Sequence, residues 1–122
     1  MRLGALVILG VLVAVCSSGS SDDGAIVIQM FDNRFEPADF TVEQGTEVVF
    51  RGAGRNPHNA VAADSSWSTE SSFGSLEQFD GDDATVVFNT PGTYQYFCTF
   101  HGNAEGRGMA GTVEVVPAEE SQ

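Results

Sequence analysis

The chain has 122 residues, with fourteen glycines and four prolines, a length that fits one domain of ordinary size and leaves no room for two separate cores. Its formal net charge is -12, and its five basic side chains other than histidine are all arginines. Because phosphate backbones attract basic surfaces, this charge argues against nucleic acid as a partner and favours a neutral or basic one.

The first fifteen residues, "MRLGALVILGVLVAV", combine one arginine with an apolar run that is short for a membrane span. This pattern predicts a signal peptide over residues 1–15. The run ends on Cys16, and "VAVCSSGSSDDG" resembles a lipoprotein signal, in which the cysteine is acylated and becomes the mature N-terminus. Val15 departs from the Gly, Ala or Ser usual in such signals. The alternatives are an uncleaved anchor helix and a plain secretory signal, and all three place the domain outside the cytoplasm, in a periplasm or at a cell surface.

Polar segments flank the region that can form a domain. Residues 16–24 follow the apolar run with the small polar composition of a flexible linker, which would hold the domain close to a membrane. Residues 118–122 form a short polar tail at the other end. We expect neither segment to carry chemistry.

Between these ends, residues 25–117 show short β-branched runs broken by Gly, Pro, Asn and Asp, without a sustained helical period. The predicted strands are 25–31, 39–44, 46–52, 58–63, 84–89, 93–98 and 111–116. About seven or eight strands with many turns favour an all-β fold, a two-sheet Greek-key β-sandwich. Within residues 64–83 we expect one irregular strand around 74–79 and a contact between Trp67 and the core.

The stretch "TYQYFCTFHGNAEGRGM" concentrates possible metal ligands near the end of the domain. The two-residue period of a strand places Tyr94, Tyr96 and Cys98 on one face, so the thiol is expected at the strand's end. His101 follows three residues later, and glycines then let the loop double back before Met109 opens the last strand. The cysteine, the histidine and the methionine would thus converge on one point.

A thiolate, an imidazole and a thioether form a ligand set that favours copper over zinc, calcium or magnesium, and a second imidazole would complete it. His58 is the only other histidine, and it lies in "GRNPHNAVA", where Pro57 fixes the approach of the chain. A histidine at the start of a strand, facing the loop end of a sandwich, would meet the other three residues.

These residues resemble those of a cupredoxin, a small blue copper protein of the plastocyanin, amicyanin and halocyanin type, over roughly residues 25–117. The most specific part is the CxxH motif followed by a methionine and preceded by "PGTYQYFC". The upstream "PHN" and the opening "NRFEPADFTVEQGTEVVF" also fit. Seven residues separate His101 from Met109, more than in plastocyanin, which bears on the surface shape of the loop and not on the identity of the ligands.

The resemblance implies one copper ion per domain. Its ligands would be the ring nitrogens of His58 and His101, the thiolate of Cys98 and, as a long axial ligand, the thioether of Met109.

Two further roles follow from the resemblance. Asn59 would tie the two ligand-bearing loops together through hydrogen bonds to the backbone around Thr99. Tyr94 takes the place of a buried tyrosine that pins the corner of its strand, a structural role.

Other interpretations of the same residues are weaker. A disulfide between Cys16 and Cys98 would join the signal boundary to a ligand loop. A structural zinc site would have a poor ligand in Met109. A Cys/His hydrolase would use Cys98 as nucleophile and a histidine as base, but the sequence shows no sign of an oxyanion hole or of a substrate cleft.

A copper ion held by two histidines, a cysteine and a weak methionine has no obvious open position for a substrate, so we expect electron transfer and no enzymatic activity. The expected partners are redox proteins such as a cytochrome, an oxidase or a reductase, and the protein is expected to be a monomer. The resemblance also implies that His101 would be partly exposed and carry the electron, with Phe100 beside it in a docking surface. The alternatives are a copper carrier that delivers the metal to an oxidase and a redox-silent adhesion module.

Overall fold

The computed structural model describes residues 25–119. The expected signal peptide, the linker with Cys16 and the end of the polar tail lie outside the described residues. Among residues 25–119, no helix has the length and apolar character needed to cross a membrane.

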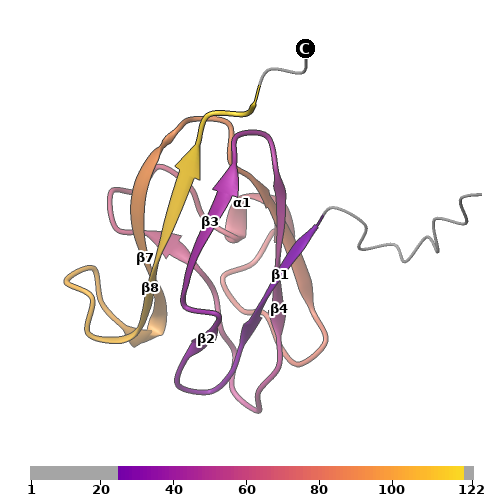
Figure 1. Cartoon of the computed structure of the whole chain (residues 1–122). Coiled ribbons are helices and arrows are strands. Elements are labelled where there is room, and N and C mark those ends of the chain that lie inside the picture. The colour runs from indigo at the N-terminus through magenta and orange to yellow at the C-terminus, as the bar shows by residue number, and fades with distance from the viewer. Residues whose placement is uncertain (1–24, 120–122) are drawn as a thin grey trace, which may run out of the picture.

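Two four-stranded sheets face each other, and both mix parallel and antiparallel pairs (Figure 1). The first sheet has the order β2-β1-β4-β6, and the second has the order β3-β8-β7-β5. The strands of the first sheet are β1 (Ile26–Met30), β2 (Phe35–Glu36), β4 (Glu47–Gly52) and β6 (Asp83–Val87). Those of the second are β3 (Asp39–Glu43), β5 (Val61–Ala62), β7 (Gly92–Gly102) and β8 (Gly108–Val116). The expected all-β, two-sheet sandwich is confirmed.

The core forms because alternate residues of each strand point between the sheets. In β4, for example, Val48 and Phe50 are buried, and in β7 Tyr96 and Cys98 are buried. Aromatic rings gather at the centre of this core, where Phe50 and Tyr96 pack edge to face with their ring centroids 5.9 Å apart. Trp67 stacks on Phe50 at 5.7 Å, which confirms the expected contact between Trp67 and the core.

Two expectations for the middle of the chain are wrong. The strand predicted over 58–63 is reduced to β5, because the backbone of residues 58–60 hydrogen-bonds to other segments. The main chain of His58 pairs with that of Gln78, and the N–H of Thr69 donates to the carbonyl of Ala60. The irregular strand expected around 74–79 is this single bridge at Gln78. It is preceded by an unexpected short helix, α1 (Glu70–Phe73), which ends at Gly74 in the left-handed conformation.

The last hairpin is longer than the sequence pattern indicated. We expected β7 to end at Cys98 and β8 to begin at residue 111, whereas β7 continues to Gly102 and β8 begins at Gly108. The pairing is interrupted between Phe97 and Gly102 and resumes with the pair Gly102–Gly108. Cys98 and His101 therefore lie on one strand, and both fall within the irregularity, where the regular alternation of side chains is interrupted.

Candidate metal centre

Strand β7 carries two of the four expected ligands. Cys98 continues the buried face that begins with Tyr96, and its thiol is fully buried and free of a disulfide in the described part of the chain. His101 lies three residues later, just before the pairing resumes at Gly102, and is exposed, as expected. The strand thus brings one ligand from the core and the other from the surface to the same end of the sandwich.

The hairpin tip requires glycine on both strands. A Cβ atom on Gly102 would lie 2.3 Å from the carbonyl oxygen of Met109, and one on Gly108 would lie 2.3 Å from that of His101. Gly108 also has a φ of +72°, which side chains disfavour. These glycines allow the backbone of Met109 to approach Gly102 and that of His101 to approach Gly108. Met109 itself is fully buried and belongs to the same core cluster as Cys98.

His58 comes from a different part of the chain, just before β5. Its backbone is fixed by two hydrogen bonds with Gln78, of 2.9 and 3.0 Å, and both side chains are fully buried. Pro57, which precedes it, restricts the backbone of the approach. The His58 imidazole is therefore held in one place without the support of a regular strand.

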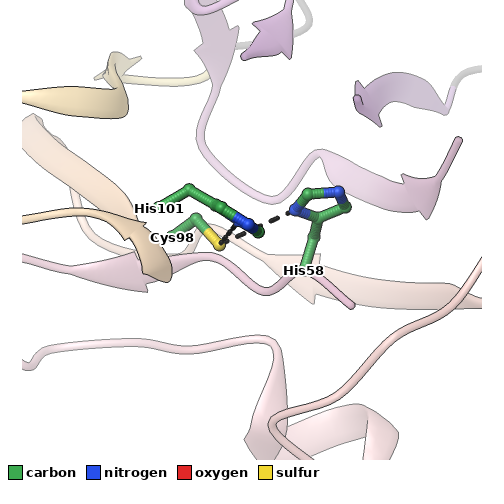
Figure 2. A group of neighbouring side chains, drawn as sticks. All are labelled: His58, Cys98 and His101. Carbon is green, nitrogen blue, oxygen red and sulfur yellow. Dashed lines mark hydrogen bonds between the residues drawn. The ribbon is translucent and has the colours of Figure 1, made fainter. Parts of the chain in front are cut away.

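The three side chains converge, as Figure 2 shows. The Sγ atom of Cys98 lies 3.9 Å from Nδ1 of His58 and 3.7 Å from Nδ1 of His101. One ligand atom from each of the three residues lies within 4.8 Å of the other two. A single metal ion bound by all three would sit between these atoms, and one sulfur with two imidazole nitrogens is a donor set that suits copper.

The two imidazoles have unlike environments. Burial lowers the pKa of His58, and the hydrogen bond with Asp32 raises it. A positive charge on His101 would lower it further. A neutral imidazole keeps the ring lone pair that a metal needs. The ring of His58 is therefore neutral and able to bind a metal near neutral pH, whereas the ring of His101 is exposed to water.

Asn59 links the two ligand-bearing segments, as expected. Its Oδ1 accepts the backbone N–H of Thr99 at 2.9 Å, and its Nδ2 donates to the Thr99 hydroxyl at 2.8 Å. The same Nδ2 donates to the carbonyl of Leu76 at 3.0 Å. Asn59, which follows His58, is thereby joined to Thr99, which follows Cys98. Asn59 is also joined to the segment that follows α1.

The expectation for Tyr94 requires a correction. Its hydroxyl donates to the carbonyl of Thr90 at 2.8 Å, which fixes the turn into β7, but the ring is only half-buried. The deeply buried tyrosine is Tyr96, whose hydroxyl donates to the carbonyl of Ala38. Tyr94 lies nearer the start of β7, where the core gives way to solvent, so the alternation of the strand does not enclose it fully.

One contact of the site was not foreseen. Asp32, in the loop between β1 and β2, accepts a hydrogen bond from the second ring nitrogen of His58 at 3.2 Å. The two residues are 26 positions apart, and nothing in "FDNRF" marks a ligand partner. Only the pairing of β1 with β4 brings this loop beside the segment that precedes His58.

Replacing Asn59 with alanine tests the link between the two segments. The change would leave the Thr99 N–H and the Leu76 carbonyl without their partner, so we expect the free energy of unfolding of the copper-free protein to fall by about 1–3 kcal/mol. Urea denaturation gives this value.

The matched control is Asn103→Ala, because Asn103 also accepts two backbone N–H groups, from Glu105 and Arg107, but in an exposed loop where water can replace it. This variant should stay within about 0.5 kcal/mol of the wild type. Equal losses in the two variants would contradict a special role for Asn59.

Comparison with known proteins identifies relatives of the chain. The model of the copper-binding proteins of the plastocyanin/azurin family matches residues 24–116. Plastocyanin of Scenedesmus fuscus is 32% identical over 100 residues, which cover 78% of this chain and 92% of that protein. Chloroplastic plastocyanin of Oryza sativa subsp. indica is 33% identical over 86 residues, which cover 66% of this chain but only 54% of the relative.

Solved structures agree on the fold. A reduced amicyanin variant superposes with a TM-score of 0.58 at 25% identity, covering 76% of this chain and 83% of amicyanin. A copper-containing nitrite reductase of Thermus scotoductus SA-01 superposes with a TM-score of 0.61 at 23% identity, but the match covers 80% of this chain and 23% of the enzyme. With the sequence match over nearly the whole described region, the two-sheet sandwich and the His–Cys–His group, the chain belongs to the plastocyanin/azurin family of copper-binding proteins.

Proposed function

We propose that the protein is a mononuclear type 1 (blue) copper protein that shuttles single electrons between redox proteins outside the cytoplasm. The observation that carries this proposal is the convergence of Cys98 with two histidines, of which one is buried and the other exposed. The copper supplies a reversible one-electron couple when bound. The protein's contribution is to hold the ligand atoms in one arrangement.

The residues around the ligands favour a rigid site. Cys98 directly follows the continuously paired part of β7 and β8, which ends at Phe97, and the buried side chain of His58 is held on a hydrogen-bonded backbone. Asn59 connects these two segments directly. Because oxidised and reduced copper prefer different geometries, a protein that resists rearrangement favours fast electron exchange in both directions. A carrier that releases its metal would need the opposite property.

Met109 is proposed as the fourth, axial ligand. It is fully buried in the same core cluster as Cys98, at the start of the strand paired with β7. Its backbone approaches that of Gly102, the residue after His101. A thioether is a weak ligand, so its expected effect is on the reduction potential more than on the retention of copper.

His101 is the proposed route for the electron. It is exposed, and the neighbouring Phe100 leaves 44% of its surface open, with the two ring centroids 6.4 Å apart. This pair offers a small docking surface of mixed character. The net charge of -12 would steer a basic cytochrome, oxidase or reductase toward the protein over longer distances.

The remaining proposals concern location, assembly and activity. We infer that the protein acts as a monomer without enzymatic activity, in the periplasm or at the cell surface, held to the membrane by a lipid on Cys16. The resemblance of the N-terminal segment to a lipoprotein signal supports the anchor. Support for the absence of catalysis comes from the complete ligand set, which leaves no obvious place for a substrate.

Copper binding and exchange test the proposed function. Addition of Cu(II) to the purified protein should give an intense blue colour and a narrow copper hyperfine splitting, because both report a strong bond to the Cys98 thiolate. Cys98→Ser should abolish the colour, whereas the matched Cys16→Ser should keep it. A pale product with an ordinary copper spectrum would contradict the blue site.

The loaded protein should also exchange electrons rapidly and reversibly with a basic cytochrome, and added salt should slow this exchange because it screens the attraction. Preferential binding of Cu(I) with slow redox cycling would instead identify a copper carrier. An unchanged or faster rate with added salt would count against electrostatic steering.

Substitutions at Met109 test the axial ligand. Met109→Leu should keep a blue site and raise the reduction potential, since a weak donor is lost. Met109→Gln should lower the potential, because an oxygen donor favours Cu(II). Voltammetry of the three proteins beside their visible spectra provides the measurement. Loss of copper from the leucine variant, or shifts of both variants in the same direction, would remove Met109 from the ligand set.

Substitution of Cys16 tests the lipid anchor. Cell fractionation should find the wild-type protein with membranes, and Cys16→Ser should release the protein or leave it unprocessed. A stable anchor needs more than one acyl chain, which a lipoprotein-type cysteine would carry. Soluble wild-type protein that begins downstream of Cys16 would show a plain secretory signal.

A further inference from the structure

The carboxylate of Asp32 lies against the chain segment that leads to His58. Its Oδ1 atom accepts the backbone N–H groups of Arg55 and Asn56, at 2.7 and 3.0 Å, in addition to Nε2 of His58. The side chain of Asp32 is 41% exposed, so its carboxyl group is ionised at neutral pH like that of an ordinary aspartate. Three donors from one short segment therefore converge on one anionic oxygen.

The chain makes space for this carboxylate. A Cβ atom on Gly54 would lie 2.2 Å from Oδ1 of Asp32 and 3.0 Å from its backbone nitrogen. Any larger residue at position 54 would push the two loops apart. Glycine at this position is thus matched to the close approach between the carboxylate and the segment that leads to His58.

The hydrogen bond with Asp32 gives the two ring nitrogens of His58 different protonation states. An ionised carboxylate can only accept hydrogen bonds, so Nε2 must carry the proton that it donates to Asp32. The neutral ring then has its lone pair on Nδ1, the nitrogen that faces Cys98 at 3.9 Å. Figure 2 shows the other ring nitrogen of His58 directed away from Cys98.

His101 differs in this respect. Among residues 25–119, the only hydrogen-bond contact of the His101 ring is that of Nδ1 with Cys98. Within this described region its second ring nitrogen has no partner comparable to Asp32, so solvent or a docked protein can contact that nitrogen. Of the two histidines, only His58 has a carboxylate on its distal ring nitrogen in the described part of the chain.

We propose that Asp32 is a positioning residue that fixes the tautomer of His58 and lowers the reduction potential of the copper through its negative charge. A carboxylate that accepts the distal N–H of a ligand histidine orients the ring and increases its basicity. A nearby negative charge also stabilises Cu(II) more than Cu(I), because Cu(II) carries the larger positive charge. Both effects stabilise Cu(II) relative to Cu(I) and therefore lower the reduction potential.

The proposal rests on the copper site described above, and its test separates the two. Asp32→Asn keeps an oxygen that can accept the same hydrogen bonds but removes the charge. We expect this variant to remain blue and to lower the affinity for Cu(II), relative to Cu(I), by about tenfold, which corresponds to a rise in potential of about 59 mV. Voltammetry of the loaded protein measures this shift.

The matched control is Asp64→Asn. The Asp64 carboxylate also accepts hydrogen bonds within its own loop, from the N–H and the hydroxyl of Ser66, but it contacts neither histidine. This variant makes the same change in net charge and should leave the potential near that of the wild type. Equal potentials for the two variants would overturn the proposal. A wild-type protein that does not turn blue with Cu(II) would instead refute the copper site itself.

A second measurement needs neither a variant nor copper. Nitrogen NMR of the His58 ring in the copper-free wild-type protein should show the proton on Nε2 and an unprotonated Nδ1. A proton on Nδ1 would overturn the proposal even if Asp32→Asn failed to fold. A purely structural role for Asp32 would change the stability of the variants but would leave the potential of a folded, blue Asp32→Asn protein unchanged.

Discussion

The site depends on the hydrogen bonds between Asn59 and Thr99, which join two segments that are 40 residues apart in the sequence. A metal bound by residues from two such segments can have a defined geometry only if the segments are fixed relative to each other. Asn59 performs this task from a buried position, where an amide without partners would be costly. Because His58 precedes Asn59 directly and Cys98 precedes Thr99 directly, this link sets the relative positions of the imidazole and the thiolate.

The core of the sandwich holds the strand that carries one end of this link. Tyr96 lies one step along the same face of β7 from Cys98 and packs among Phe35 and Phe50. Aromatic rings of this size bury much apolar surface and restrict the movement of the strand that they belong to. The buried cysteine is therefore attached to the aromatic core of the molecule, while the same strand carries His101 to the surface. The contrast between a rigid interior and an exposed ligand suits a protein that exchanges electrons at its surface.

The sequence alone determined much of the fold and the candidate site. Alternation with a period of two predicted the strands around Ile28, Phe50 and Tyr96, because a strand buried on one face must repeat its apolar residues in this way. The same period placed Cys98 on one face with Tyr94 and Tyr96. The scarcity of histidine and cysteine in the chain, with the spacing of Cys98 and His101, indicated a copper site, because few ligand sets combine these soft donors.

Tertiary structure decided what depends on contacts between distant segments. The backbone of residues 58–60 lost its predicted strand because its hydrogen bonds go to Gln78 and Thr69, a choice that local pattern does not record. The extension of β7 to Gly102 follows from its pairing with Gly108 across the hairpin. The contact between Asp32 and His58 arises only when β1 and β4 pair and bring their following loops together. The sequence indicated the candidate ligands, because residue types determine which metals a site can bind, but only the packed chain determined how each of these side chains is held.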